Sequence, residues 1–446
     1  MLDSPEDKAG RVHIETYGCE MNRADSEIVS ALLEEQGYLR AEHPDDAGVI
    51  LVNTCAIREH AQERALANIA QLKRYKEADA TVRIGVLGCL STHLGETIAA
   101  RLPFLDWILG PDAYRSLPVL LRTERKKQPT ILLQSDRESE LYEDLLPARR
   151  DGINAWVTIS RGCSNHCTYC VVPKARGPER HRPLASIMRE VNAAVEEGFP
   201  QVTLLGQNVN SWRGGDDGTP AFPDLLRQVA ETPGLKRVRF LTSHPKDCSD
   251  ELIHILGRGG AITPQLHLPV QAGSNAVLKR MNRRYTAEHY LELVDKAQNS
   301  IPGLLLSTDI IVGFPGESAE DFRRTLELVQ WVGFDEAFVY KYSPRLGTPA
   351  FKLEDDVPDE VKIERLTLVN DVIRRSGRKR REKLIGSTLP VLIESDSARD
   401  PNEWMGRSPA GHVIVLPKGE QESPGDEISV RIEELSGFTL RGIRAD

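Results

Sequence analysis

The chain has 446 residues, of which 40% are hydrophobic, and its formal net charge is −9. At about 150 residues per domain, this length predicts about three domains. The sequence has no run of about 18 apolar residues and no lipidation motif, so we expect no membrane-spanning or membrane-anchored protein. The net negative charge excludes binding of nucleic acid through the overall charge of the protein, so only local basic surfaces could bind it.

The first part of the chain alternates buried strands with helices. We expect strands at 12–17, 48–53 and 83–88, and helices at 25–36 and 59–76. Such alternation predicts an open parallel α/β sheet. The carboxyl ends of parallel strands meet at one edge, where open α/β sheets gather their functional loops.

Three of the seven cysteines, Cys19, Cys55 and Cys89, each follow one of these strands by one or two residues. A single free cysteine is usually a small buried hydrophobe. Repetition of the same strand-end position three times is hard to ascribe to packing. We therefore interpret the three as ligands of an iron–sulfur cluster with one iron left without a cysteine. Cys248 has no partner in this pattern and is expected to be structural.

After a charged segment at 122–150, which suits an interdomain connection, the strand–helix alternation resumes. We expect six further strands, at 155–160, 201–205, 237–241, 265–268, 306–312 and 336–342. Six strands joined by helices predict a partial (β/α)6 barrel. The next segment, GCSNHCTYC at 162–170, follows the first of these strands and so falls at the carboxyl-terminal face, where barrel active sites are built.

That segment spaces Cys163, Cys167 and Cys170 as CxxxCxxC. Three thiolates at this spacing can hold three corners of a [4Fe–4S] cube and leave the fourth iron open, whereas electron-carrying clusters take four cysteines. A disulfide would need an oxidising compartment, and the opening residues lack an apolar signal segment, so we expect a cytoplasmic protein. A structural zinc site would need a second cysteine pair nearby. The loop resembles that of the radical-SAM enzymes, whose open iron binds S-adenosylmethionine (SAM).

The last part of the chain has a different residue pattern. A helix at 359–383 carries a dense basic run from Arg374 to Lys383, and smaller basic clusters occur at 122–127, 174–182 and 279–284. Four such clusters in an acidic protein favour an RNA partner. From 387 onward, short alternating segments predict a small all-β barrel of about sixty residues. From Gly386 onward the barrel is acidic, with six Lys or Arg against eleven Asp or Glu.

Nearly the whole chain resembles the methylthiotransferases of the radical-SAM superfamily. The matching segments are TYGCEMN at 16–22, NTCAIRE at 53–59, GCL at 88–90, GCSNHCTYCVVP at 162–173, LLGQNVNSW at 204–212, TSHP at 242–245, LHLPVQAGS at 266–274, TDIIVGFPGE at 308–317 and YSPRLGTP at 342–349. The resemblance implies an amino-terminal cluster domain at 10–125, a radical-SAM core at 149–383 and a TRAM domain at 386–446.

The resemblance also implies the reaction. One SAM methylates a sulfur carried by the auxiliary cluster of Cys19, Cys55 and Cys89, and a second SAM, at the cluster of Cys163, Cys167 and Cys170, activates the substrate. The segment 207–212 favours a tRNA substrate, whose N6-isopentenyladenosine at position 37 gains a 2-methylthio group. The expected cofactors are two [4Fe–4S] clusters and SAM; the expected partners are a tRNA anticodon stem-loop and an external electron donor. We expect a monomer, and the sulfur donor stays open.

Seven further residues lie within the matching segments, at or near expected strand ends. They are candidates for contact with SAM, namely Tyr169, Gln207, Asn208, Ser243, Gln271, Ser274 and Asp309. Tyr169, between two cysteines, is expected to pack beside the adenine. Each of the others could equally be a loop cap or a hydrogen-bonded core residue.

Three other functions remain open at this point. Members of the same family act on threonylcarbamoyladenosine in tRNA or on an aspartate of ribosomal protein S12, and an acidic barrel would suit the latter, basic partner. A non-catalytic RNA-binding protein with structural clusters would show no SAM cleavage. The two three-cysteine sets argue against that last function, because a structural cluster gains nothing from an open iron.

Overall fold

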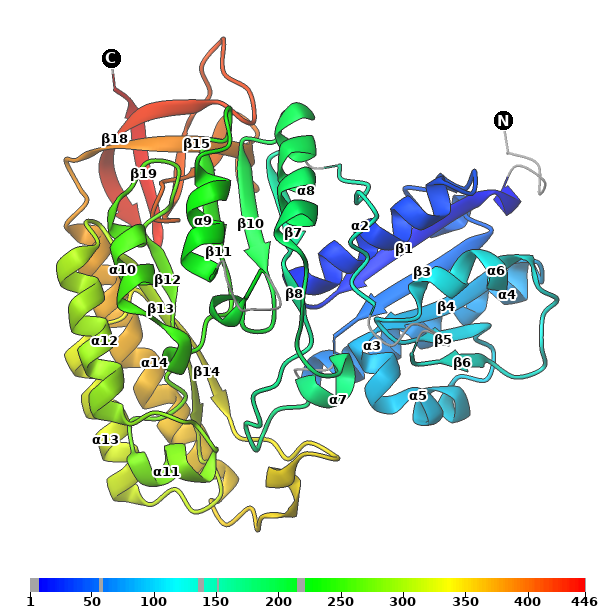
Figure 1. The fold of residues 1–446 in the computed structure, drawn as a ribbon, viewed down its shortest axis with the longest axis horizontal. Helices are drawn as coiled ribbons and strands as arrows, with labels where there is room; N and C mark the ends of the chain where they lie inside the picture. The colour runs from blue at the N-terminus through cyan, green and yellow to red at the C-terminus, as the bar shows by residue number, and fades with distance from the viewer. Residues whose placement is uncertain (1–7, 56–58, 135–139, 151, 215–220, 446) are drawn as a thin grey trace.

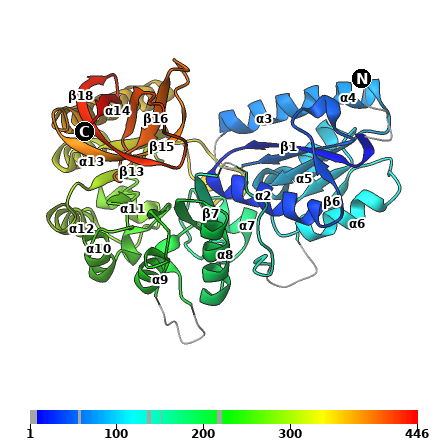
Figure 2. The ribbon, with the colours of Figure 1, turned by 90° about the horizontal axis from the view of Figure 1, so that it is seen from above.

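The computed structural model describes residues 8–55, 59–134, 140–150, 152–214 and 221–445. It consists of three parts (Figure 1): an amino-terminal α/β sheet, a central half-barrel of strands covered by helices, and a carboxyl-terminal β-barrel. Seen from above in Figure 2, the amino-terminal sheet lies beside the half-barrel, and the β-barrel lies at the far end from it. No helix in the described ranges is long and apolar enough to cross a membrane.

The amino-terminal sheet has six parallel strands in the order β2-β1-β3-β4-β5-β6. Its elements are β1 (Arg11–Tyr17), α2 (Glu20–Glu34), β2 (Leu39–Arg40), β3 (Val49–Thr54), α3 (Glu59–Gln71), α4 (Lys73–Ala78), β4 (Arg83–Gly88), α5 (Cys89–Arg101), β5 (Trp107–Leu109), α6 (Leu117–Arg122) and β6 (Thr130–Leu132). Apolar side chains are buried on both faces of this sheet, as expected for parallel strands covered by helices. The three predicted strands are confirmed.

The segment 122–150 is more than a connection. Its strand β6 extends the amino-terminal sheet, and the Tyr142 ring is buried 5.9 Å from the Tyr114 ring. The hydroxyl of Tyr142 donates to the carbonyl of Pro111 at 3.0 Å. The interpretation of this segment as a simple link was therefore wrong, because three-residue strands and single buried aromatics leave no periodic signal in a charged sequence.

The central part contains the six predicted strands, all parallel, in two three-stranded sheets ordered β11-β10-β7 and β12-β13-β14. The strands are β7 (Asn154–Thr158), β10 (Gln201–Leu205), β11 (Arg237–Phe240), β12 (Gln265–His267), β13 (Leu305–Val312) and β14 (Glu336–Lys341). A parallel bridge from Val238 to Ile262 links the two sheets. The short hairpin β8 (Ser160–Arg161) and β9 (Arg180–His181) frames the cysteine loop. This is the predicted half-barrel.

Helices pack on one face of these strands and form the largest apolar core of the molecule. They are α8 (Leu184–Glu196), α9 (Phe222–Ala230), α10 (Asp250–Gly257), α11 (Asn275–Arg280), α12 (Ala287–Ser300), α13 (Ala319–Val332) and α14 (Asp359–Glu382). The short helix α7 (Val172–Arg176) packs instead on α5 of the amino-terminal part. Helix α14 confirms the long helix that the sequence predicts. Cys248 is buried in this core, as a structural cysteine would be.

The carboxyl-terminal part is a closed barrel in the order β15-β16-β17-β19-β18. Its strands are β15 (Thr388–Asp396), β16 (Glu403–Arg407), β17 (Val413–Pro417), β18 (Glu427–Ser436) and β19 (Thr439–Arg444). The barrel docks on the amino-terminal ends of the central strands: the buried Arg237 at the start of β11 pairs with Glu427 at 2.6 Å and donates to the carbonyl of Arg407 at 2.7 Å. It therefore lies away from the strand ends that carry the cysteine loop.

Candidate functional site: two cysteine sets at adjoining strand ends

The three amino-terminal cysteines lie at one edge of the sheet. Strands β1, β3 and β4 run in register, so that Tyr17 is opposite Thr54 and Thr54 is opposite Gly88. The backbone NH of Cys55 donates to the carbonyl of Tyr17 at 3.1 Å, which ties the second cysteine to the end of the first strand. The structure therefore places Cys19, Cys55 and Cys89 at a common edge, as the sequence predicts.

Two glycines make this close approach possible. Gly18 has φ +142°, and a Cβ atom there would lie 2.5 Å from the Cβ of Cys55. Gly88 has φ +96°, and its Cβ would lie 2.4 Å from the Oδ1 of Asn53. Any side chain at either position would push two cysteine-bearing loops apart, so these positions need glycine for both backbone conformation and space.

Two buried asparagines join the loops of Cys19 and Cys55. The Nδ2 of Asn22 donates to the Oδ1 of Asn53 at 2.9 Å, and the Nδ2 of Asn53 donates back to the carbonyl of Asn22 at 2.8 Å. Asn22 also accepts a hydrogen bond from the thiol of Cys19 at 3.3 Å. Groups that hydrogen-bond around metal ligands fix the orientation of those ligands. Residues 56–58 of the matching segment after Cys55 lie outside the described residues.

The thiols of this set differ in acidity. A hydrogen bond with Cys55 and the charge of Arg176 outweigh burial and lower the pKa of Cys19 to about 6. Burial raises the pKa of Cys89, an effect that Arg176 opposes. Cys19 immediately precedes α2 and Cys89 begins α5, so both lie at helix amino termini, where backbone NH groups favour a thiolate or an anionic cluster.

The second set lies in the loop after β8. The backbone of Thr168 donates to the carbonyl of Met281 at 3.1 Å and accepts from the NH of Ala350 at 2.8 Å, so the loop is fixed against two distant segments. The thiol sulfurs accept backbone hydrogen bonds, from Asn165 to Cys163 at 3.4 Å and from Val172 to Cys170 at 3.5 Å. NH groups that point at sulfur are the usual environment of an iron–sulfur ligand.

Both sets fit a cluster rather than a single ion. Burial, together with the neighbouring charges of Cys167 and Cys163, raises the pKa of the Cys170 thiol to about 12. Within the described part of the chain, no three His, Cys, Asp or Glu side chains surround one ion-sized position. A cube does not require that arrangement, because each cysteine ligates a different iron. Binding would displace the protons of those thiols whose pKa burial raises, namely Cys89, Cys163 and Cys170.

The two cysteine sets adjoin. Helix α7, which follows Cys170 directly, packs on α5, and Cys89 is buried against Val171 and Ala175. Arg176 at the end of α7 donates through Nε to the sulfur of Cys89 at 3.0 Å. One short helix therefore links the loop of the second set to a ligand of the first.

Two of the residues predicted to contact SAM present free polar atoms. The buried oxygens Gln207 Oε1 and Asn208 Oδ1 have no partner among the described residues, and the same holds for the hydroxyls of Thr158 and Ser160 at the ends of neighbouring strands. Unsatisfied buried polar groups are costly, and each needs a partner such as a ligand or an ordered water. The set fits a polar ligand such as the amino acid or ribose part of SAM. Asn208 is held by Asp247, to which its Nδ2 donates at 2.7 Å.

The other predicted residues are placed differently. Ser243 donates to the carbonyl of His267, and Ser274 donates to Asp321, so both hydroxyls already have partners within the fold. Asp309 pairs with the ring of His267 at 3.4 Å and is part-exposed. These contacts within the fold are what hydrogen-bonded structural residues would make, which was the other role expected for these three residues.

Two of the seven are set apart by strain or packing. Gln271 has φ +67° and bonds both backbone groups to β13, through Asp309 and Ile311. Positive φ in a residue other than glycine is costly and concentrates at functional sites. Tyr169 packs on the central core with its ring 6.4 Å from Phe314, and burial raises its pKa well above the usual value.

Four charged residues at this site were missed or given another role: Asp25, Arg161, Arg176 and Arg283. Arg176 and Arg283 belong to the basic clusters 174–182 and 279–284 that were expected to favour RNA, but both are buried, so for them that expectation was wrong. Arg161 and Arg176 both pair with the buried Asp25, at 2.8 and 2.7 Å. Arg283 donates to the sulfur of Cys167 at 3.4 Å and to the carbonyl of Pro269 at 2.9 Å. The one available signal is that Arg161 and Arg176 flank the cysteine loop in the sequence.

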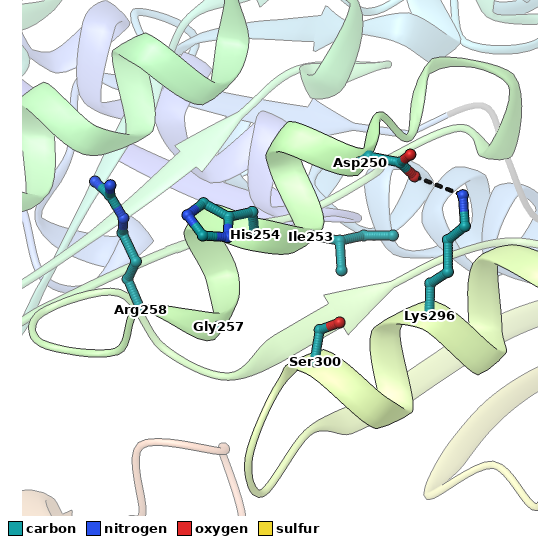
Figure 3. Close-up of a pocket in the computed structure, with 7 residues that line it drawn as sticks. All are labelled: Asp250, Ile253, His254, Gly257, Arg258, Lys296 and Ser300. Atoms are coloured by element: carbon teal, nitrogen blue, oxygen red, sulfur yellow. Dashed lines mark hydrogen bonds and ion pairs between the residues drawn. The ribbon is translucent and has the colours of Figure 1, made fainter.

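A cavity on the outer helical layer is a separate feature. Figure 3 shows it between α10 and α12, lined by Asp250, Ile253, His254, Gly257, Arg258, Lys296 and Ser300. Its one internal pair, Asp250 with Lys296 at 2.8 Å, is exposed to solvent. None of the predicted site residues lines it, and we assign it no role in the chemistry.

Three family models match the chain, one on each part of the fold. Residues 11–110 match the uncharacterized protein family UPF0004, residues 157–329 match the radical SAM superfamily, and residues 382–443 match the TRAM domain. Similar solved structures include the radical SAM methyltransferase TsrM from Kitasatospora setae, with TM-score 0.56 and 14% identity over 76% of each chain. The cobalamin-dependent enzyme OxsB has TM-score 0.54 and 12% identity over 82% of this chain and 56% of its own. These structures show a shared fold.

Sequence relatives are much more similar. The tRNA-2-methylthio-N(6)-dimethylallyladenosine synthase of Clostridium botulinum (strain Hall) is 41% identical over 97% of this chain and 96% of its own. The enzyme of the same name from Clostridium tetani is 40% identical over 99% of this chain and 98% of its own. At this identity and coverage, the chain belongs to the family of the tRNA-2-methylthio-N(6)-dimethylallyladenosine synthases within the radical SAM superfamily.

Proposed function

We propose that this protein is a radical-SAM methylthiotransferase that converts N6-isopentenyladenosine at position 37 of tRNA to its 2-methylthio derivative. Its cofactors are two [4Fe–4S] clusters and SAM. The observation that carries the proposal is the pair of three-cysteine sets, brought together by α5 and α7 in a chain about 40% identical to synthases of that name.

Each cysteine set has its own role. Cys163, Cys167 and Cys170 hold the cluster whose open iron takes SAM, and Cys19, Cys55 and Cys89 hold the auxiliary cluster. SAM at the reduced cluster supplies the radical chemistry that an inert aromatic C–H bond requires. The protein holds the cysteines in place, through the Asn22–Asn53 pair on one side and backbone NH donors to sulfur on the other.

The residues that bind SAM lie at the ends of β7 and β10. The free oxygens of Gln207 and Asn208 and the hydroxyls of Thr158 and Ser160 provide acceptors and donors for its amino, carboxylate and ribose groups. Tyr169, between two cluster ligands, packs beside the adenine. Ser243, Gln271, Ser274 and Asp309 shape the neighbouring strand ends, where Gln271 is held in a strained conformation.

A local basic surface on α14 binds the tRNA anticodon stem-loop. Arg374, Arg375, Arg378, Lys379 and Lys383 are exposed. Arg380 and Arg381 of the same run instead bind the fold, to the carbonyl of Gly333 at 2.7 Å and to Glu336. An external electron donor is a further partner. A reducing cytoplasm suits seven free thiols.

The test is anaerobic reconstitution with iron and sulfide, followed by SAM, reductant and tRNA bearing N6-isopentenyladenosine. Digested nucleosides are then analysed by mass spectrometry. We expect a mass gain of one methylthio group at position 37. The matched control, Cys19→Ala with Cys55→Ala and Cys89→Ala, should still cleave SAM and transfer no sulfur.

Other outcomes identify other functions. SAM cleavage without a modified nucleoside would overturn the substrate assignment and direct the assay to threonylcarbamoyladenosine tRNA or to ribosomal protein S12. Absence of both products from a protein with two verified clusters would overturn the catalytic assignment altogether.

A further inference from the structure

Arg176 lies between the two cysteine sets and is buried, with 4% of its surface exposed. Its Nε donates to the sulfur of Cys89 at 3.0 Å, and its Nη2 donates to Asp25 at 2.7 Å. Its third nitrogen, Nη1, is buried and has no partner among the described residues. A fully buried guanidinium with an unused donor is costly unless an acceptor completes it.

The charges around Arg176 do not balance. Asp25 is fully buried and is shared by Arg161 and Arg176, so these three side chains sum to one excess positive charge. Asp112 lies 3.8 Å from Arg161, but it is part-exposed and pairs more closely with Arg180, at 2.8 Å. Buried charge that its neighbours leave uncompensated calls for a buried anion. A [4Fe–4S] cluster with three thiolate ligands is such an anion.

The other cysteine set has a corresponding arginine. Arg283 is buried and donates through Nη1 to the sulfur of Cys167 at 3.4 Å. Its Nη2 donates to the carbonyl of Pro269 and its Nε to the hydroxyl of Tyr285, each at 2.9 Å. Each cysteine set therefore has one ligand sulfur that accepts a hydrogen bond from one buried arginine. The reduction potential of an iron–sulfur cluster depends on hydrogen bonds to its sulfurs and on nearby charge.

We propose that Arg176 is a positioning residue that raises the reduction potential of the auxiliary cluster through Cys89, and that its buried, free Nη1 is available as a donor to that cluster. Reduction adds negative charge to the sulfur ligands, so a donor and a positive charge stabilise the reduced state. Asp25 counteracts Arg176, because its carboxylate neutralises part of the same charge. This inference rests on the proposed assignment of Cys19, Cys55 and Cys89 as cluster ligands.

The experiment measures each cluster alone. A Cys163→Ala, Cys167→Ala, Cys170→Ala background retains the auxiliary cluster, whose midpoint potential is titrated under EPR. In it, Arg176→Gln should shift the potential to a more negative value, Arg176→Lys should shift it less, and Asp25→Asn should shift it the opposite way. Arg237→Gln, which removes a buried arginine that pairs with Glu427 of the β-barrel and has no contact with either cysteine set, should leave it unchanged.

The reciprocal background, Cys19→Ala with Cys55→Ala and Cys89→Ala, tests selectivity. There Arg283→Gln should lower the potential of the remaining cluster and Arg176→Gln should not. If Arg176→Gln fails to fold, as judged by circular dichroism, the opposite shift in Asp25→Asn still tests the proposal. Unchanged potentials in the Arg176 or Asp25 variants, with iron content at the level of the background, would overturn it.

Iron content separates this failure from that of the proposed function. Absence of about four irons per chain in the first background would show that Cys19, Cys55 and Cys89 hold no cluster. A normal iron content with an unmoved potential would leave the ligand assignment intact and reject the role of Arg176 alone.

Discussion

At the scale of single residues, the Asn22–Asn53 pair allows a test of how the auxiliary cluster assembles. Asn53→Ala removes three hydrogen bonds, two with Asn22 and one to the hydroxyl of Ser26, and takes one acceptor from the buried amide of Asn22. Each unmet buried group costs about 1–3 kcal/mol. Since the pair joins the loops of Cys19 and Cys55, we expect the variant to retain one cluster and lose most of the auxiliary one. Iron analysis and Mössbauer spectroscopy of the reconstituted protein would measure this.

Asn210 provides the matched control for that variant. It is also a buried asparagine, and it donates to the carbonyl of His244 at 3.0 Å in the central part, away from the auxiliary cysteines. Asn210→Ala should lower thermal stability to a similar extent while the auxiliary cluster keeps its iron. Equal iron loss in the two variants would show that the Asn22–Asn53 pair acts on general stability only.

A second residue-scale prediction concerns pH. Burial, followed by the charges of Arg283 and Lys246, lowers the pKa of His244 to about 2. The unfolded chain takes up a proton near pH 6.5 and the folded chain does not, so stability falls as pH drops below 6.5, by up to about 1.4 kcal/mol per unit. Thermal unfolding of the metal-free protein from pH 7.5 to 5 should therefore show a shallower pH dependence in His244→Gln than in the wild type.

His289→Gln is the control for this measurement, because His289 is an exposed histidine on α12. Its pH dependence should match the wild type. A wild-type slope in His244→Gln would mean that other groups, such as His412, whose pKa burial lowers to about 4, carry the acid sensitivity of the fold.

The grouping of the cysteines could be predicted from the sequence, and the burial of the arginines beside them could not. Cysteine is rare, so its spacing at 163, 167 and 170 and its repetition after strands are informative in one dimension. Arginine is common, and what distinguishes Arg176 and Arg283 is burial against a sulfur, which depends on contacts between segments 87 and 116 residues apart. Asp25 was equally invisible, because it falls inside a helix with an ordinary amphipathic pattern.

At the scale of elements, long strands and helices were predictable and short ones were not. All six central strands appear where periodicity places them, since each is a buried run within a repeating unit. Strands β5 and β6 have three residues each, too few for any period to be visible. In the β-barrel, β16 contains Gly406, where a Cβ would lie 2.5 Å from the carbonyl of Leu392. From the sequence alone, such a glycine suggests a turn, although here it permits two strands to pack closely.

Helix α14 and the acidic β-barrel differ in how strongly we expect them to attract tRNA. Five of the barrel's cations are ion-paired with its own carboxylates, in the pairs Arg407–Glu394, Lys418–Asp396, Arg431–Glu433, Arg441–Glu403 and Arg444–Glu422. Paired cations in an acidic domain attract phosphate weakly. The exposed cations of α14, such as Lys379, are better placed for phosphate contacts.

Charge reversal distinguishes the two elements. Arg375→Glu with Lys379→Glu should weaken tRNA binding and reduce the slope of log K against log salt by about 1 for each phosphate contact removed. Arg431→Glu in the β-barrel should change the slope little. Binding titrations at four or five salt concentrations would measure both, and a larger effect from Arg431→Glu would place the RNA on the barrel.

At the scale of the whole molecule, the placement of the amino-terminal part against the central part could not be predicted from the sequence. Helix α2 packs on β7 (Figure 1). Met21 and Ala24 of α2 are buried against Trp156 and Leu205. Beside this small apolar contact lies the buried Asp25 between Arg161 and Arg176. Residues that face another domain have the same apolar or charged appearance as residues that face their own core. The contact became evident only when the side chains were placed in three dimensions.

Asp25 therefore stabilises the whole assembly rather than one domain. Asp25→Ala leaves two buried arginines without their shared partner, and removal of one member of a buried pair costs about 3–5 kcal/mol. We expect the amino-terminal sheet of the metal-free variant to unfold in a separate, earlier thermal transition, with faster hydrogen exchange in α2. Glu34→Ala, at an exposed pair on α2 with Arg150 at 3.0 Å, should leave the transitions nearly unchanged because exposed pairs contribute about 0–1 kcal/mol. A single, unshifted transition in Asp25→Ala would mean that the apolar contact of α2 with β7 is enough to hold the two parts together.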